Sequence, residues 1–215
     1  MNIPRTRIKI CGLTRVEDAL AAAHSGADAI GLVFHPPSPR AISRERAREI
    51  SVALPPFVST VALFVNGTAQ TVSAMIEAVR PSLLQFHGDE DEAFCAQFGL
   101  PYLKAIRIGG GMESGDLLEC ERTFRSAKAL LLDTLSATVY GGSGAVFNWD
   151  LIPPAMRHRI VLSGGLNADN VASAVGRIRP WAVDVSSGVE TAEKGVKDHR
   201  KIAQFIEAVK NANAG

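Results

Sequence analysis

Cys11 is the residue of this chain best placed to act as a base. It lies in KICGLT (residues 9–14), where the first apolar, strand-like run stops and a helix is expected to begin. A thiol free in water has a pKa of about 8.5, and helix N-termini and nearby cations lower that value. We therefore expect Cys11 to have a lowered pKa and to react as a thiolate. The alternative is a small apolar residue that ends a strand.

Asp133 is the matching candidate for an acid. It directly follows the wholly apolar run Leu130–Leu132. Partial desolvation at such a position favours the protonated carboxyl, which can serve as a general acid; capping of a turn is the alternative. One base and one acid on opposite sides of a ligand suit an isomerisation that moves protons.

Arg40 is a candidate for holding a carboxylate. It closes the loop HPPSPR (residues 35–40), in which three prolines restrict the backbone and so fix the position of the cation. A guanidinium can bind a carboxylate through two parallel hydrogen bonds. An ordinary surface loop would explain the same residues.

Two late glycine-rich turns are candidates for binding phosphate. They are SGGLN (163–167), with Gly164 and Gly165, and SSGVE (186–190), with Ser187 and Gly188. Glycine lets backbone N–H groups approach an anion closely, and a helix that starts behind each turn adds a favourable dipole.

A third glycine cluster follows Asp133 and comprises Gly141, Gly142, Ser143 and Gly144. We expect it to form a hinged lid over the ligand, anchored at its far end by Phe147 or Trp149. A flexible connector is the alternative.

The elements that must position these residues alternate along the chain. Eight short apolar runs predict strands at residues 8–11, 29–34, 60–65, 83–86, 102–108, 129–132, 160–162 and 182–185. Apolar stripes with helical spacing lie between most of them, at 16–23, 72–79, 171–178 and 202–209. Thr14 with Glu17 forms a possible capping box, and the acidic run 89–92 suits the positive end of a helix dipole.

This alternation predicts an α/β fold, a single (β/α)8 TIM barrel that spans residues 1–215 as one domain. A doubly wound open sheet is the alternative, but the first turn lacks a GxGxxG fingerprint. In a barrel the active site gathers at the C-terminal ends of the strands. The polar residues there are Cys11, His35, Asn66, His87, Arg107, Asp133, Ser163 and the stretch Asp184–Ser187.

Composition narrows the class of partner. The net charge is +1, from 23 basic and 22 acidic residues. This balance lacks the excess of positive charge that would favour binding to nucleic acid or to an acidic membrane. No apolar run reaches the length of a membrane span. The three cysteines are far apart and form no CxxC pair. Charge and cysteine usage therefore favour a small-molecule ligand and the reducing cytoplasm. The two late glycine-rich turns make a phosphorylated ligand the expectation, and we expect a monomer or a homodimer.

Taken together, eight segments resemble the phosphoribosylanthranilate isomerase family, and they occur in order over nearly the whole chain. They are KICGLT (9–14), GADAIG (26–31), SPR (38–40), QFHG (85–88), LD (132–133), GGSG (141–144), SGGLN (163–167) and DVSSGVE (184–190). The resemblance implies a (β/α)8 barrel that catalyses an Amadori rearrangement in tryptophan biosynthesis, without metal or organic cofactor.

The resemblance also implies roles for individual residues. Asp133 protonates the ribose ring oxygen, and Cys11 as thiolate removes the proton from C2 of the sugar. Arg40 holds the anthranilate carboxylate, and His87 and Asp184 contact polar groups of the substrate. Backbone groups around Gly164, Gly165, Ser187 and Gly188 hold the phosphate. Many relatives carry threonine and aspartate where this chain has Ser143 and Asn148.

Two other functions compete with this interpretation. A ketopentose-phosphate epimerase would need metal ligands, which His35, His87 and Asp184 could loosely supply, but its His-x-Met-Asp pattern is missing because His35 runs into two prolines. A non-catalytic barrel that binds a phosphorylated ligand would be expected to lose the acid or the base, yet Cys11 and Asp133 are both present.

Overall fold

The computed structural model describes residues 5–134 and 147–214 and contains a closed barrel of eight parallel strands. Each strand pairs with the next in chain order, and β8 closes the barrel against β1. The strands are β1 (Arg7–Cys11), β2 (Ala29–Val33), β3 (Ser59–Phe64), β4 (Leu83–Phe86), β5 (Tyr102–Ile108), β6 (Ala129–Thr134), β7 (Ile160–Leu162) and β8 (Ala182–Val185). The predicted strands and the (β/α)8 fold are confirmed.

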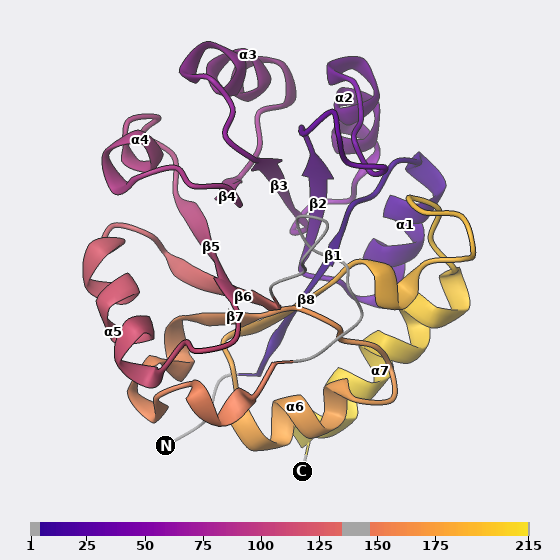
Figure 1. The fold of residues 1–215 in the computed structure, drawn as a ribbon. Helices are drawn as coiled ribbons and strands as arrows, with labels where there is room; N and C mark the ends of the chain where they lie inside the picture. Colours follow the sequence, from indigo (N-terminus) through magenta and orange to yellow (C-terminus); the bar gives the residue numbers. More distant parts are fainter. Residues whose placement is uncertain (1–4, 135–146, 215) are drawn as a thin grey trace.

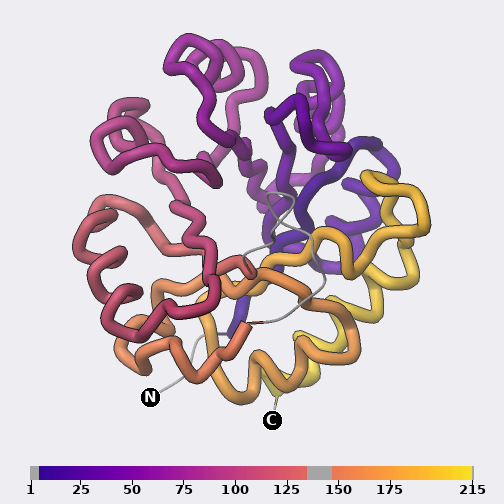
Figure 2. The backbone as a smooth tube through the Cα atoms, in the orientation of Figure 1, coloured from indigo at the N-terminus to yellow at the C-terminus, as the bar shows by residue number. Residues whose placement is uncertain are grey.

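Helices surround the barrel (Figure 1). They are α1 (Val16–Ser25), α2 (Arg44–Ala53), α3 (Ala69–Val79), α4 (Glu92–Ala96), α5 (Ser114–Thr123), α6 (Val171–Ile178) and α7 (His199–Ala214), with 3-10 turns η1 (Trp149–Leu151), η2 (Pro154–Arg159) and η3 (Ser187–Val189). The chain passes once around the barrel, so that α7 lies against α1 and closes the ring (Figure 2). The four predicted apolar stripes fall within α1, α3, α6 and α7.

The predicted helix start signals hold only in part. Thr14 does not form a capping box: Arg15 precedes α1, and the Thr14 hydroxyl donates instead to the Gly195 carbonyl at 2.6 Å. In the acidic run, Asp91 caps α4 by accepting from the Phe94 N–H at 2.7 Å. Glu90, however, is buried beside a lysine of β5 rather than exposed at the helix end.

Apolar side chains fill both sides of the sheet. A large cluster lies between the strands and the helices. Inside the barrel, the lower layer consists of Leu103, Ala105, Ala129, Leu131, Val161 and Ala182. Cys11, Val33, Leu63 and Val65 form a smaller cluster near the C-terminal ends of the strands. Apolar and polar side chains therefore lie side by side at the C-terminal ends of the strands.

The predicted lid residues Gly141, Gly142, Ser143 and Gly144 lie outside the described residues. Beyond them, Trp149 is buried in the main core. Asn148 caps η1 by accepting from the Asp150 N–H at 3.1 Å, a role that asparagine performs as well as aspartate. Within the described part of the chain, no helix has the length and apolar character to cross a membrane.

Candidate active site

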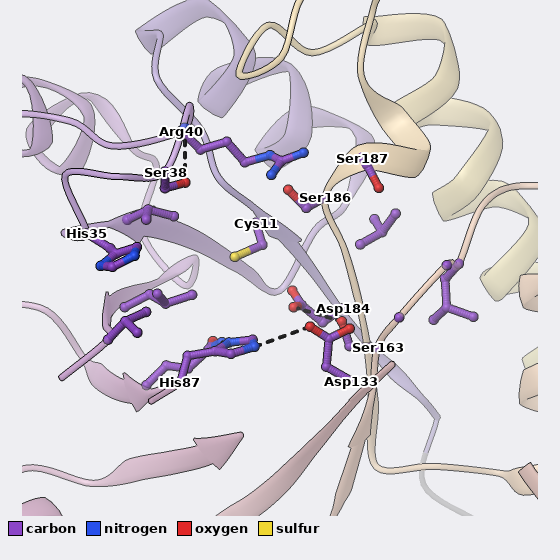
Figure 3. A pocket seen from close by; sticks show the side chains of 18 residues that line it. Cys11, His35, Ser38, Arg40, His87, Asp133, Ser163, Asp184, Ser186 and Ser187 are labelled. Carbon is purple, nitrogen blue, oxygen red and sulfur yellow. Dashed lines mark hydrogen bonds and ion pairs between the residues drawn. The ribbon is translucent and has the colours of Figure 1, made fainter. Parts of the chain in front are cut away.

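A pocket of about 690 Å³, open to solvent, lies at the C-terminal ends of the strands. Figure 3 shows the Cys11 sulfur, the Asp133 carboxyl and the Arg40 guanidinium around this one opening. The sequence-predicted residues that line it are Cys11, His35, Arg40, His87, Asp133, Ser163, Gly164, Gly165, Asp184 and Ser187. These predicted residues come from six of the eight strand ends, and the end of β3 adds the apolar Leu63 and Val65. The predicted Asn66 and Arg107 do not line this pocket.

Cys11 ends β1 and is buried. The prediction that a helix start lowers its pKa is wrong, because α1 begins only at Val16. Burial raises the pKa of the Cys11 thiol above its ordinary value, although Lys9 and Lys197 oppose the shift. In the free protein this thiol therefore needs help from its surroundings to become a thiolate.

Lys9 supplies the nearest positive charge to this thiol and was not among the predicted site residues. It lies two residues before Cys11 on β1, in register with Asp184 of β8. Its Nζ donates to Asp184 Oδ1 at 2.8 Å, and both side chains are buried. The signal was present in the sequence: a lysine inside an apolar strand, on the same face as Cys11, has to find a buried partner.

Asp133 emerges from β6 and is also buried. His87, predicted to bind substrate, lies against it: Nε2 is 3.2 Å from Asp133 Oδ2 (Figure 3), although the ring N–H does not point along that line. The other nitrogen, Nδ1, lies 3.0 Å from the Gln85 amide nitrogen. If the Gln85 amide donates to Nδ1, the ring proton is on Nε2, the nitrogen that lies nearer to the Asp133 carboxyl. His87 is therefore placed to orient Asp133.

Arg40 reaches the pocket from the loop after β2, but one edge of its guanidinium is already occupied. Nε and Nη2 donate to the two carboxylate oxygens of Glu190 at 2.7 and 2.8 Å. Lys197 donates to the same carboxylate at 3.0 Å. Gly12, at φ +74°, leaves room for the Arg40 stem, which a β-carbon there would strike. Glu190, which Lys197 also contacts, holds Arg40 in place and leaves the Nη1 side of the guanidinium for a ligand.

The electrostatics of Glu190 agree with this arrangement. Burial alone would raise the pKa of its carboxyl, but Arg40 and Lys197 outweigh burial and hold the pKa below its usual value. Glu190 is therefore a buried carboxylate between two cations. Sequence reasoning placed Glu190 in a motif without a role, and it missed Lys197.

The two glycine-rich turns lie against each other at one side of the pocket. Gly164 and Gly165 both have positive φ, +81° and +66°. A β-carbon at Gly188 would collide with the Leu166 carbonyl, so Gly188 lies behind the pocket wall while Ser187 faces the opening. The backbone of both turns is therefore available to one anion. The predicted helix dipole behind the first turn acts from further away than expected, since α6 begins only at Val171.

The geometry gives little support to a metal-dependent epimerase. Asp184 pairs with Lys9, and His87 contacts Gln85 and Asp133. Within residues 5–134 and 147–214, no three His, Cys, Asp or Glu side chains are grouped so that they could hold a metal ion.

Comparison with known proteins gives a consistent result. The family model described as N-(5'-phosphoribosyl)anthranilate (PRA) isomerase matches residues 8–208. An N-(5'-phosphoribosyl)anthranilate isomerase of Dechloromonas aromatica (strain RCB) is 56% identical over 209 residues, which cover 97% of this chain and 98% of the relative.

Solved structures agree. The phosphoribosyl anthranilate isomerase from Thermotoga maritima superposes with a TM-score of 0.86 at 44% identity, over 96% of this chain and 99% of that one. A phosphoribosyl anthranilate isomerase in complex with reduced 1-(o-carboxyphenylamino)-1-deoxyribulose 5-phosphate gives a TM-score of 0.82 at 42% identity, with the same coverage.

Proposed function

This chain belongs to the N-(5'-phosphoribosyl)anthranilate isomerase family, and from that premise we propose that Cys11 is the base and Asp133 the acid of its reaction. The reaction is the Amadori rearrangement of N-(5-phosphoribosyl)anthranilate to 1-(2-carboxyphenylamino)-1-deoxyribulose 5-phosphate, a step of tryptophan biosynthesis. The observation that carries the proposal is that the Cys11 thiol and the Asp133 carboxyl face one pocket from different strands.

The first step belongs to Asp133. The protonated carboxyl donates its proton to the ribose ring oxygen, the bond from that oxygen to C1 breaks, and the nitrogen lone pair forms a protonated Schiff base. The contact with His87 keeps the carboxyl aimed into the pocket. General acid catalysis of this kind is typically worth about 10² to 10⁴-fold.

The second step belongs to Cys11. Its thiolate removes the proton from C2, and the electron pair of that C–H bond moves toward the positive nitrogen to give an enolamine. The enolamine then gains a proton at C1 and loses the proton of its C2 hydroxyl to give the ketone. For a full cycle, the proton that Cys11 gained and the proton that Asp133 gave up are exchanged back, which restores the thiolate and the carboxylic acid. The acid is needed before the base, because the Schiff base makes the C2 proton removable.

The remaining pocket residues hold the substrate. Arg40 binds the anthranilate carboxylate through the Nη1 side that Glu190 does not use. Backbone N–H groups of Gly164, Gly165 and Ser187 bind the phosphate, with Gly188 allowing the two turns to approach each other. Gly141, Gly142, Ser143 and Gly144 are proposed to close over the ligand.

We further propose one catalytic domain over residues 1–215 that works in the cytoplasm as a monomer or homodimer, on a small phosphorylated substrate and without nucleic acid. The three cysteines are unpaired, which fits a reducing compartment.

A fluorescence assay that follows the loss of phosphoribosylanthranilate tests the proposal. We expect wild-type protein to accelerate the loss far above the background rate and Cys11→Ala to remain near background. The proposal fails if the wild type gives only the background rate, and the role of Cys11 fails if Cys11→Ala retains wild-type activity.

A further inference from the structure

We propose that Lys9 is the positioning residue that stabilises the Cys11 thiolate, and that Asp184 controls how much of the Lys9 charge the sulfur experiences. This inference rests on the proposed role of Cys11 as the base. It assigns to the buried Lys9–Asp184 pair a function in catalysis rather than in folding alone.

The placement of the three side chains follows from the barrel. Lys9 and Cys11 are two residues apart on β1, so both point into the barrel interior. Asp184 is the register partner of Lys9 on β8 and receives its ammonium at 2.8 Å. The ammonium is therefore fixed directly below the sulfur.

Gly31 brings the sulfur and the ammonium to the same place. It is the register partner of Cys11 on β2. A β-carbon at Gly31 would lie 2.6 Å from the Cys11 sulfur and 3.1 Å from the Lys9 nitrogen. Both groups thus border the small volume that the missing side chain leaves, and no side chain from β2 separates them.

The charges around the sulfur have opposing effects. Burial raises the pKa of the thiol most strongly; Lys9 lowers it, through its charge and as a hydrogen-bond donor, and Asp184 raises it. Burial also acts to lower the pKa of Lys9, but Asp184 and Cys11 together outweigh it and raise the pKa, so that Lys9 stays an ammonium. The titratable and charged groups that face Cys11 are Lys9 from β1, Asp184 from β8, Arg40 and His35 from the loop after β2, His87 after β4, Asp133 from β6 and Lys197 before α7.

Two anions therefore share one cation whenever Cys11 is ionised. With a neutral thiol, the Lys9 ammonium is neutralised by Asp184. With a thiolate, the same ammonium lies between sulfur and carboxylate, so the Asp184 carboxylate weakens the electrostatic stabilisation that Lys9 gives to the thiolate. Removal of the Asp184 charge should favour the thiolate, and removal of the Lys9 charge should disfavour it. If the Lys9–Asp184 pair only supported the fold, the two substitutions would not be expected to shift thiolate formation at Cys11 in opposite directions.

The test is the pH dependence of iodoacetamide labelling at Cys11, mapped by mass spectrometry on the ligand-free protein. Asp184→Asn, which keeps the side-chain shape, should move the labelling midpoint to lower pH. Lys9→Met added to that variant should raise the labelling midpoint again, by about one pH unit. At a fixed pH below both midpoints, this shift corresponds to labelling that is about tenfold slower. As the matched control, Lys104→Met removes a buried lysine outside the barrel and should leave the Cys11 midpoint unchanged.

An unchanged midpoint in Asp184→Asn, or a shift to higher pH, overturns the inference even if the double variant does not fold. If the double variant folds, a midpoint equal to that of Asp184→Asn also overturns it. Labelling requires no turnover, so the assay of phosphoribosylanthranilate loss reports separately on the proposed function. Opposite midpoint shifts in a protein without isomerase activity would reject that function and the catalytic role of the pair, while the effect of Lys9 and Asp184 on the Cys11 thiolate would still hold.

Discussion

Two buried cysteines of this protein each lie beside a buried lysine and carboxylate, yet only one faces a pocket. Cys11, inside the barrel, has the Lys9–Asp184 pair below it and the open pocket above it. Its sulfur also interacts electrostatically with Arg40 at the pocket rim and with the buried Lys197. A thiolate formed here can meet a substrate.

Cys95, outside the barrel on α4, has the same kinds of neighbours. Lys104 pairs with Glu90 at 3.0 Å and also donates to the Gly88 carbonyl at 2.7 Å. Cys95 itself is enclosed by aromatic side chains. Burial raises the pKa of Cys95 to about 12, so this thiol remains protonated.

The difference shows that a thiol with a charged pair is not by itself a catalytic site. What separates the two regions is access to a ligand and the presence of Asp133, the proposed acid, in the pocket of Cys11. The predictions below remove these distinguishing features one at a time, from the largest expected effect on catalysis to the smallest.

Asp133→Asn removes the acid while leaving the Cys11 thiol in place. We expect kcat to fall by about 10² to 10⁴-fold with a smaller change in KM, because the amide keeps the shape but cannot deliver the proton. Steady-state kinetics measure this, and iodoacetamide labelling of Cys11 should persist as the control. Near wild-type kcat would show that another group supplies the proton.

Arg40→Ala removes the cation that distinguishes the rim of the Cys11 pocket. We expect KM to rise by about one to two orders of magnitude with a smaller fall in kcat, since a charged hydrogen bond contributes roughly 1.5–3 kcal/mol. Arg44→Ala is the matched control, because that arginine lies on the exposed start of α2. An unchanged KM would place Arg40 outside the substrate site.

The pH profile of kcat/KM should report the ionisation of Cys11. Burial raises the pKa of this thiol, so the thiolate fraction, and with it kcat/KM, should increase with pH up to and beyond the ordinary thiol value of about 8.5. Asp184→Asn should move this acid limb to lower pH. A limb that does not move between wild type and Asp184→Asn would separate the observed ionisation from Cys11.

Lys104→Met tests the other side of the comparison. It leaves the Glu90 carboxylate buried without its partner, which typically costs about 3–5 kcal/mol of folding free energy. We expect urea unfolding to show this loss while kcat stays close to wild type below the unfolding transition. A large loss of kcat in a stably folded variant would mean that the outer pair also serves the active site.

The sequence predicted the framework of the site well, because periodic patterns report strands and because parallel strands of a barrel must end together. All eight strands follow from that rule, and so do most of the polar pocket residues from Cys11 to Ser187. The same rule also selected Asn66 and Arg107, which do not line this pocket. The alternation of β1 also places Lys9 and Cys11 on one face of the strand.

The contacts between distant segments could not be predicted. Asp184 pairing with Lys9 depends on the register between β8 and β1, and Glu190 binding Arg40 depends on how two loops fold over the rim. The lowered pKa expected for Cys11 was wrong for the same reason: it assumed a helix start next to the thiol, whereas burial among distant strands determines the shift.

Inactivation by iodoacetamide tests the central claim, that Cys11 and not Cys95 does the chemistry, most directly. Aliquots are taken during the reaction, and the remaining isomerase activity is compared with the modified fraction of each cysteine by mass spectrometry. We predict that activity falls in step with modification of Cys11 while Cys95 stays unmodified, and that a product analogue slows both. Protein that is fully modified at Cys11 and still active would contradict the account.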